Sequence, residues 1–438
     1  MIALYDERET LAAMRNDVRE AVTAARAAQQ EWFARPVRER AARIGAIRPL
    51  LAAHAAEIAR VTASLSDRPV AEKLVSEVLP LLEACRFLQK NAARILRPQR
   101  HGARGRPLWL QGSSFEVHRK PFGVILIVGA GNYPLFIPAV QIVHAVAAGN
   151  AVVVKPAEDS AAPLAAFIDD ILSAAGIPEQ LVQLLDESPE AARQAVRCGI
   201  DKAVFTGSSG NGRDFLAELA KFNTPSVMEL SGADAVYVRD DADVELAAKA
   251  IAFGSHLNGG DTCMAPHGII VQNRAASALA NALGKLGVSA DTIFTVQDDA
   301  EALQMASMDE HGLGAAIFSR DEKAAEAFAR QLSTGFVTIN DIIVPTADPR
   351  LPFGGVRGSG FGVTRGVEGL IEMTYPQPIA IRRSRFLPHL EKPQRDDAEL
   401  FAAFAALTHT RGVANRIGAL RHLFTAARAR IRTTRTTK

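Results

Sequence analysis

Short apolar runs alternate with helical stretches along the middle of the chain, and this alternation limits the fold more than any other feature. From Gly123 onward, the runs are β-branched and the stretches between them carry apolar residues at helical spacing. Strands and helices in this order predict βαβ units around a buried parallel sheet, and so an α/β fold. The predicted strands are Gly123–Gly129, Ala151–Lys155, Leu181–Asp186, Lys202–Thr206 and Ser226–Leu230, with helices at Pro138–Ala148, Ala162–Ala175, Pro189–Cys198 and Gly212–Phe222.

The regions on either side have their own patterns. Residues 8 to about 98 have the apolar spacing of several amphipathic helices, and Leu108–Arg119 alternates around a turn as a β-hairpin does. A second alternating region runs from Asp234 to about Gly369 and contains the Gly-dense loop Leu351–Gly362, which needs unusual backbone angles. The other predicted elements are strands at Gly268–Val271, Ala315–Phe318, Gly335–Asn340 and Pro378–Arg382, and helices at Ala275–Leu286, Ala398–Leu407 and Ile417–Ala429.

Composition excludes several classes of function. The net charge of +2 gives no case for a nucleic-acid or membrane protein, and the most apolar stretch, Phe122 to Ala130, is too short to span a bilayer. The tail after about Pro388 is basic, and we interpret it as a solvated extension. Three scattered cysteines are too few for a disulfide framework or a zinc site, so we expect no metal. No signal peptide is visible, and we expect a cytoplasmic protein.

Polar residues follow the predicted strands at the edge where open α/β sheets bind ligands. Lys155 closes one strand and Glu158 follows it; a lysine and a carboxylate there can hold the hydroxyls of a nucleoside ribose. Gly207 and Ser208 lie in a Gly/Ser turn between a strand and a helix, where free N–H groups favour a phosphate. The alternatives are surface residues after a strand and a plain strand–helix turn.

Three further residues have the chemistry of a catalytic site. Glu229 ends a buried strand, where a carboxylate is costly unless it is paired or has a raised pKa useful to a base. Asn132 follows another strand, where its amide can donate to an oxyanion or simply form a turn. Cys263 follows a glycine-containing loop, and its reactivity depends on stabilisation of the thiolate. A lone cysteine is otherwise usually a small buried hydrophobe.

Taken together, these segments resemble the aldehyde dehydrogenase superfamily over roughly residues 20 to 382. The resemblance rests on the order of its motifs: Asn132-Tyr-Pro, Ala147–Glu158, Phe205-Thr-Gly-Ser, Glu229-Leu-Ser-Gly, Asn258-x-Gly-x-x-Cys263, Pro352-Phe-Gly-Gly and Ser359-Gly-x-Gly. It implies a Rossmann-like NAD-binding domain, an α/β catalytic domain and a β-arm for oligomerisation.

The resemblance also implies a role for each site residue. Cys263 would be the nucleophile, Glu229 the general base and Asn132 the oxyanion donor. Lys155 and Glu158 would hold the adenosine ribose, and Gly207 and Ser208 would contact the pyrophosphate of NAD, with NADP as the alternative cofactor. The substrate would be a small aldehyde, oxidised to a carboxylic acid, and the protein a homodimer or homotetramer.

The domain boundaries follow from the same comparison. We expect a helical N-terminal part at 1–107, an oligomerisation hairpin at 108–122 and an NAD-binding domain at 123–232. A shortened catalytic domain would span 233–369, an oligomerisation strand 370–387 and a basic helical extension 388–438.

The chain departs from the family pattern in four places. Ser231 replaces the first glycine of Glu-Leu-Gly-Gly, and Asp261 replaces a glutamine, where its charge is expected to raise the pKa of the Cys263 thiol. The arginine usual after the cysteine is absent. The segment between Cys263 and Gly312 is shorter than in the family. Asp291–Phe294 resembles only weakly the family motif that contacts the nicotinamide ribose. An acyl-CoA or acyl-thioester reductase, and a catalytically impaired binding or scaffold protein, are therefore the alternative functions.

Overall fold

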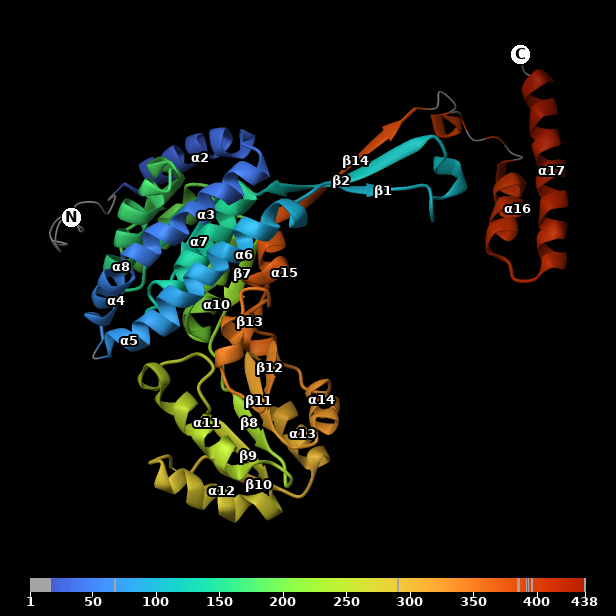
Figure 1. Ribbon diagram of the computed structural model, residues 1–438. Helices are drawn as coiled ribbons and strands as arrows, with labels where there is room; N and C mark the ends of the chain where they lie inside the picture. The colour runs from blue at the N-terminus through green and yellow to red at the C-terminus, as the bar shows by residue number, and fades with distance from the viewer. Residues whose placement is uncertain are drawn as a thin grey trace. The chain divides into compact units, whose positions relative to one another are not determined.

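The structure, a computed structural model, describes residues 17–66, 68–289, 291–383, 387–390, 392, 394 and 397–436 (Figure 1). The chain divides into two units. The larger consists of the described residues up to Gln99 together with Val117–Pro378, and the smaller consists of Arg100–Glu116 and the described residues from Ile379 onward.

The larger unit contains a six-stranded sheet, and five of its strands come from residues 124–229. Its strand order is β13-β7-β6-β3-β4-β5, and every neighbouring pair is parallel except β13 with β7. The strands predicted between residues 123 and 230 are all present within two residues, which confirms the α/β prediction. The strands are β3 (Val124–Val128), β4 (Ala151–Lys155), β5 (Val182–Leu184), β6 (Lys202–Thr206), β7 (Ser226–Glu229) and β13 (Gly360–Phe361). Residues 360–361 thus return from the second half of the chain to this sheet.

Helices enclose this sheet because its strands are apolar on both faces. Trp32 of α2 is buried and donates from Nε1 to the carbonyl of Val146, 2.8 Å away. Helix α7 ends at Gly149, whose φ of 103° suits glycine. The helices are α2 (Val18–Ala34), α3 (Val37–Ala53), α4 (Ala55–Ala63), α5 (Val70–Lys73), the π-helix η1 (Leu74–Val78), α6 (Leu79–Ile95), α7 (Phe136–Ala148), α8 (Ala161–Ala166), the π-helix η3 (Phe167–Leu172), α9 (Pro189–Arg197), α10 (Ser209–Ala220) and α15 (Gly366–Glu372).

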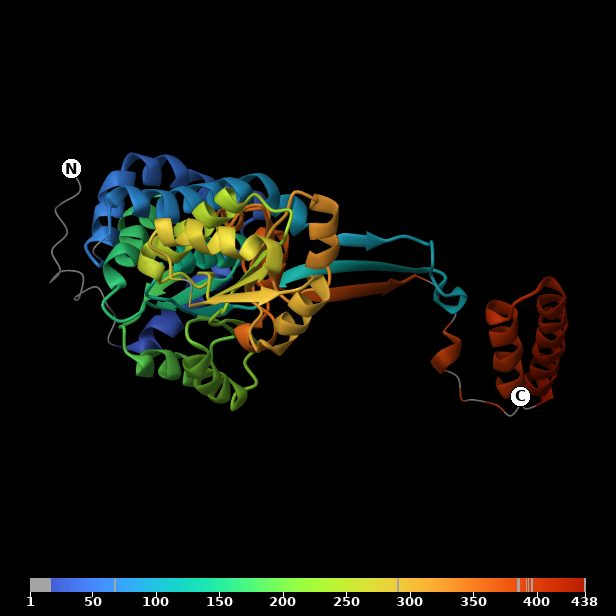
Figure 2. The ribbon, with the colours of Figure 1, turned by 90° about the horizontal axis from the view of Figure 1, so that it is seen from below.

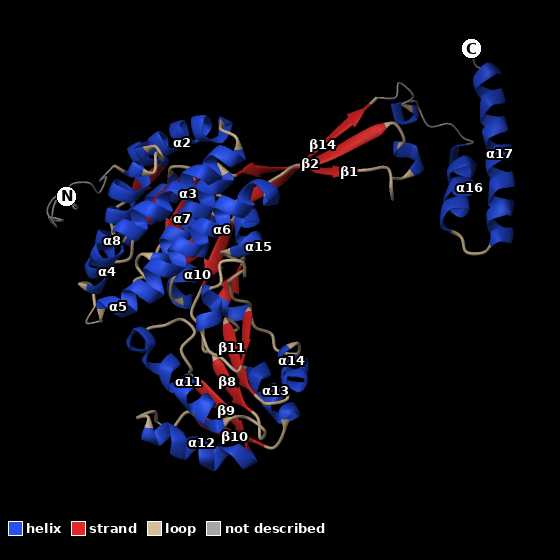
Figure 3. Cartoon of the chain, in the orientation of Figure 1, coloured by secondary structure: helices blue, strands red, loops and turns tan. Residues whose placement is uncertain are grey.

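A second, entirely parallel sheet has the order β10-β9-β8-β11-β12. Alternate residues of its strands enter two separate cores, one with α11 and α12 and the other with α13 and α14, so helices cover both faces (Figure 3). The elements are β8 (Ala235–Val238), α11 (Val244–His256), β9 (Gly268–Gln272), α12 (Asn273–Lys285), β10 (Ile293–Val296), α13 (Asp299–Met308), β11 (Gly314–Phe318), α14 (Glu322–Ala329) and β12 (Phe336–Ile339).

The third sheet has three strands in the order β1-β2-β14: Gln99–His101, Ser113–Pro121 and Thr374–Arg382. The prediction of a hairpin within 108–122 is wrong. Leu108–Leu110 form a 3-10 turn, and Ser113–Pro121 is one strand, so its partners come from outside the segment. The helices α16 (Asp397–His409) and α17 (Val413–Thr436) lie side by side (Figure 2). Within the described residues, no helix has both the length and the apolarity that a membrane crossing requires.

Candidate active site

The Cys263 loop begins where α11 ends. Three consecutive residues, Asn258, Gly259 and Gly260, have positive φ and turn the chain back, which places Thr262 and Cys263 in the wall of a cleft. The loop passes so close to the end of β7 that a Cβ on Gly232 would lie 2.5 Å from the Cys263 carbonyl oxygen. Glycine at 232 is therefore required for the approach of the two segments.

A buried polar network fixes this loop against the segment that carries Asn132. The Asn258 amide donates to the Asn132 carbonyl at 2.8 Å and accepts from Lys73 Nζ at 3.0 Å. Lys73 also pairs with Glu77 at 3.3 Å, and the Glu77 carboxylate accepts the N–H groups of Leu135 and Phe136. Each charge in the network is thus paired or hydrogen-bonded, as burial requires.

Asn132 has a free donor beside Cys263. Its side-chain oxygen accepts the N–H of Tyr133 at 3.0 Å, and its Nδ2 makes no hydrogen bond within the described residues. The chain neighbours of the two residues are joined, because the hydroxyls of Tyr133 and Thr262 lie 2.8 Å apart. An amide donor held in this way suits an oxygen that becomes negative in a reaction.

Glu229 is buried at the end of β7 and is held by three donors. Its Oε1 accepts from the Thr364 hydroxyl, and its Oε2 accepts from Thr206 at 3.2 Å and Gln141 at 3.4 Å. Burial raises the pKa of the Glu229 carboxyl, while the hydroxyls and the Arg365 guanidinium oppose the shift. A buried carboxyl with a raised pKa is a candidate for proton transfer.

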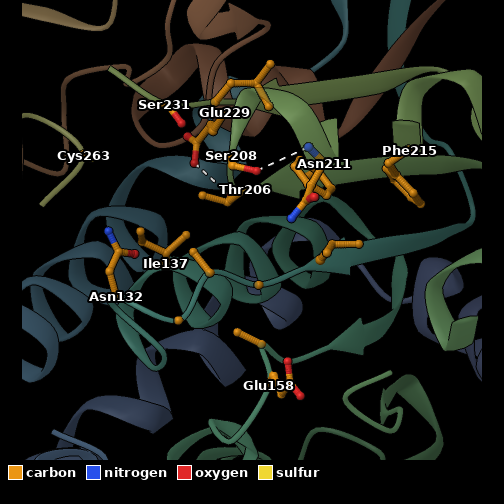
Figure 4. Close-up of a pocket in the computed structure, with 18 of the residues that line it drawn as sticks. Asn132, Ile137, Glu158, Thr206, Ser208, Asn211, Phe215, Glu229, Ser231 and Cys263 are labelled. Carbon is orange, nitrogen blue, oxygen red and sulfur yellow. Dashed lines mark hydrogen bonds between the residues drawn. The ribbon is translucent and has the colours of Figure 1, made fainter. Parts of the chain in front are cut away.

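Cys263 and Glu229 line two cavities of different character. The larger, about 810 Å³, is a cleft that also receives Asn132, Lys155, Glu158 and Ser208. In Figure 4, Cys263 and Asn132 lie at the left of this pocket, Glu229 near the top and Glu158 near the bottom. The smaller cavity, about 230 Å³, is walled mainly by apolar side chains. A group attached to Cys263 can therefore face both a polar cleft and an apolar chamber.

The environment of Cys263 favours the protonated thiol. Burial, then the nearby Asp234 and Glu229 carboxyls, raise the pKa of Cys263 to about 12, and Arg365 opposes them. The prediction that Asp261 raises this pKa is wrong, because Asp261 is exposed and Asp234 contributes the charge. Asp234 is itself buried with a pKa raised to about 7, and one of its oxygens has no partner.

The polar cleft fits a dinucleotide. Lys155 is buried without a hydrogen-bond partner among the described residues, and burial lowers its pKa. Ser208 caps α10 by accepting from the Asn211 N–H at 3.3 Å, and Gly207 precedes it at the end of β6. A helix N-terminus and an unpartnered ammonium at strand ends are the donors that phosphate and ribose oxygens require.

The weak echo of the family's ribose-contacting motif is not part of the cleft wall. Asp291–Phe294 leads into β10, the edge strand of the second sheet, and does not line the cleft. The sequence reasoning also missed Thr364 and Arg365, which reach the site because β13 returns to β7. Their one visible signal was their position directly after the Gly-dense loop.

Comparison with known proteins gives a consistent result. The model of the aldehyde dehydrogenase family matches residues 8–286 and 290–379. The chain is 26% identical to a 4,4'-diapolycopene aldehyde oxidase of Methylomonas sp, over 84% of this chain and 82% of that protein. It is 26% identical to a dimeric NADP-preferring aldehyde dehydrogenase of Canis lupus familiaris, over 86% of this chain and 99% of that protein. The crystal structure of an NAD-dependent aldehyde dehydrogenase from Sinorhizobium meliloti superposes with a TM-score of 0.78 at 23% identity, over 86% of this chain and 89% of that one.

Proposed function

This chain belongs to the aldehyde dehydrogenase family, and we propose that it uses Cys263, Glu229 and Asn132 to oxidise an aldehyde to a carboxylic acid. The observation that carries the assignment is the position of Cys263 in the walls of both cavities. An aldehyde in the apolar chamber then has its carbonyl carbon beside the thiol, while the polar cleft remains available to a dinucleotide.

Cys263 supplies the nucleophile. Its sulfur attacks the carbonyl carbon to form a thiohemiacetal, and the carbonyl oxygen takes up negative charge. The free Nδ2 of Asn132 and the backbone N–H of Cys263 donate to that oxygen. Because the environment of Cys263 favours the protonated thiol, the proton must leave to solvent in the cleft as the sulfur attacks.

Glu229 acts when the acid is released. After oxidation the substrate is held as a thioester, and Glu229 takes a proton from the water that attacks it. Thr206, Gln141 and Thr364 orient the carboxylate for this step. Retention of a carboxylate at this position supports hydrolysis to the free acid over transfer of the acyl group to coenzyme A.

The cofactor is NAD(P), and we infer a preference for NAD⁺. When bound, it accepts the hydride that leaves the thiohemiacetal carbon. Lys155 and Glu158 would hold the ribose, with Gly207 and Ser208 at the pyrophosphate. Burial lowers the pKa of Lys155, and the negative charges of Glu187 and Glu158 oppose that shift, a setting that disfavours an added 2′-phosphate.

We expect kcat/KM with NAD⁺ to exceed that with NADP⁺, measured as formation of the reduced cofactor at 340 nm. Replacing Glu158 with glutamine should lower the ratio of kcat/KM with NAD⁺ to kcat/KM with NADP⁺ roughly tenfold, because one repulsive charge is removed. Replacing Glu326 with glutamine is the control, since that carboxylate pairs with Arg330 and neither residue lines the cleft. A clear NADP⁺ preference in the unmodified protein would contradict the placement of Glu158 at the ribose.

We also propose that the protein is at least a dimer, formed through the three-stranded sheet. β14 is an edge strand with exposed Ile379 and Ile381, and an exposed apolar edge needs a partner. Light scattering at micromolar concentration should give a particle mass that is a multiple of the 46.9 kDa chain mass. Ile381→Lys should lower that measured mass. A monomer in the unmodified protein would refute the assembly. The free thiols Cys85, Cys198 and Cys263 support a location in the cytoplasm.

A further inference from the structure

A buried arginine lies in the wall of the apolar chamber that holds Cys263. Arg365 is only 9% exposed and packs between two aromatic rings, with its guanidinium carbon 4.2 Å from the Phe353 ring centre and 5.6 Å from that of Phe136. Within the described residues its guanidinium makes one hydrogen bond, from Nη1 to the Thr346 carbonyl at 2.7 Å. A guanidinium has five N–H donors, so most of its capacity is unused.

The guanidinium nitrogens of Arg365 that make no hydrogen bond retain some accessible surface. Buried side-chain atoms that lack a hydrogen bond occur at several described residues, but none of them belongs to Arg365. Its remaining N–H groups therefore retain accessible surface, and the chamber is the space that Arg365 lines. Donors held open in this way are available to a ligand in the chamber.

The charge of Glu229 acts on Arg365, but the two side chains form no close ion pair. Within the described part of the chain, no carboxylate oxygen of another residue forms an ion pair with Arg365. The titratable groups that act on it, or on which it acts, are Glu229, Cys263 and His144. The pKa of His144 is lowered to about 4 by burial, so it is neutral, and Cys263 is a neutral thiol. Glu229 is already engaged by Thr364, Thr206 and Gln141.

The backbone of Arg365 adopts a strained conformation. Arg365 has φ 64° and ψ 170°, a region that side-chain-bearing residues avoid. The Gly366 that follows also has positive φ. The aromatic contacts and the Thr346 hydrogen bond stabilise this conformation, so the guanidinium is fixed before any ligand arrives.

We propose that Arg365 binds a carboxylate carried by the aldehyde substrate, which makes aldehyde acids the preferred substrate class. A buried guanidinium with unused donors is stabilised by an acceptor, and its planar shape matches a carboxylate with paired hydrogen bonds. The chamber of about 230 Å³ is small, so the substrate is a short oxo acid rather than a long chain. This inference rests on the proposed function, since it assumes that the aldehyde reacts at Cys263.

The test compares oxo acids with neutral aldehydes in the same enzyme preparation. 4-Oxobutanoate, 5-oxopentanoate and 6-oxohexanoate are each paired with a straight-chain alkanal of matching length, and kcat/KM is measured with NAD⁺. The unmodified enzyme should favour the oxo acid at the best length. Arg365→Met should reduce that preference roughly 10- to 100-fold, mostly through KM of the oxo acid. The ratio is independent of how much protein is folded.

Two further variants separate binding from a general effect. Arg365→Lys keeps the charge without the planar pair of donors and should retain part of the preference. Arg350→Met removes an exposed arginine that pairs with Asp348. This variant should leave the ratio of kcat/KM for the oxo acid to that for the alkanal unchanged. An equal loss on both substrate types in Arg365→Met would show that Arg365 serves Cys263 or Glu229 instead, and would overturn the proposal. Oxidation of no aldehyde by the unmodified enzyme would overturn the proposed function itself.

Discussion

Replacing Cys263 with alanine is expected to abolish aldehyde oxidation, with kcat/KM falling on the order of 10⁴-fold or more. The covalent route depends on a sulfur at the junction of the two cavities, and no other cysteine lines either of them. Alanine also fits without strain, because Cys263 lies at the cavity surface. The rate of reduced-cofactor formation measures the loss, and calorimetric titration with NAD⁺ should still give binding in the variant.

The other two cysteines provide matched controls. Cys198 follows α9 and is half-buried, and Cys85 is fully buried within α6. Cys198→Ala and Cys85→Ala should keep nearly the unmodified kcat/KM, although Cys85→Ala is expected to lose some stability from the small cavity that it creates. Substantial dehydrogenase activity in purified Cys263→Ala would refute the covalent mechanism.

Replacing Glu229 with glutamine is expected to slow steady-state turnover by on the order of 10²–10⁴. Glutamine keeps the shape of the side chain but cannot take the proton of the attacking water. If acylation still proceeds, a burst of reduced cofactor should precede the slow phase. Stopped-flow absorbance resolves the two phases, and unchanged steady-state turnover would rule out Glu229 as the base.

The pH dependence provides a second readout of the same residue. Burial raises the pKa of Glu229, so its carboxyl becomes protonated, and inactive as a base, at a higher pH than an ordinary carboxyl. The kcat of the unmodified enzyme should therefore fall on the acid side above the usual carboxyl range, and Glu229→Gln should lack this limb. Glu218→Gln, which removes a carboxylate that pairs with Lys221 and Arg197 outside the cleft, should keep it.

The first sheet could be predicted because its strands are buried on both faces and so appear as continuous apolar runs. The strand β8 is harder to recognise, since it has only the four residues Ala235–Val238. β1 could not be found from apolar periodicity, because Gln99–His101 are polar and fully exposed. The alternation and the turn within Leu108–Arg119 favoured a hairpin, whereas β2 pairs with β1 and β14 from outside the segment.

The candidate site was predictable where its residues follow strands in chain order. Asn132, Glu229 and Cys263 each stand out beside a strand or a glycine-rich turn. Arg365 does not, because it reaches the chamber only when β13 pairs antiparallel with β7, more than a hundred residues earlier in the chain. The source of the thiol's raised pKa was misjudged for a similar reason. Asp261 is close in sequence but exposed, whereas Asp234 is buried beside the loop.

The mass of the reacted protein tests the central claim most directly. Glu229→Gln protein incubated with an aldehyde and NAD⁺ should accumulate the thioester, because its hydrolysis is slowed. Intact-mass measurement should then show a gain of one acyl group, and peptide mapping should locate it on the peptide containing Cys263. The Cys263→Ala/Glu229→Gln double variant should show no gain. An acyl group on another residue, or turnover in Glu229→Gln with no adduct at any time, would contradict the account.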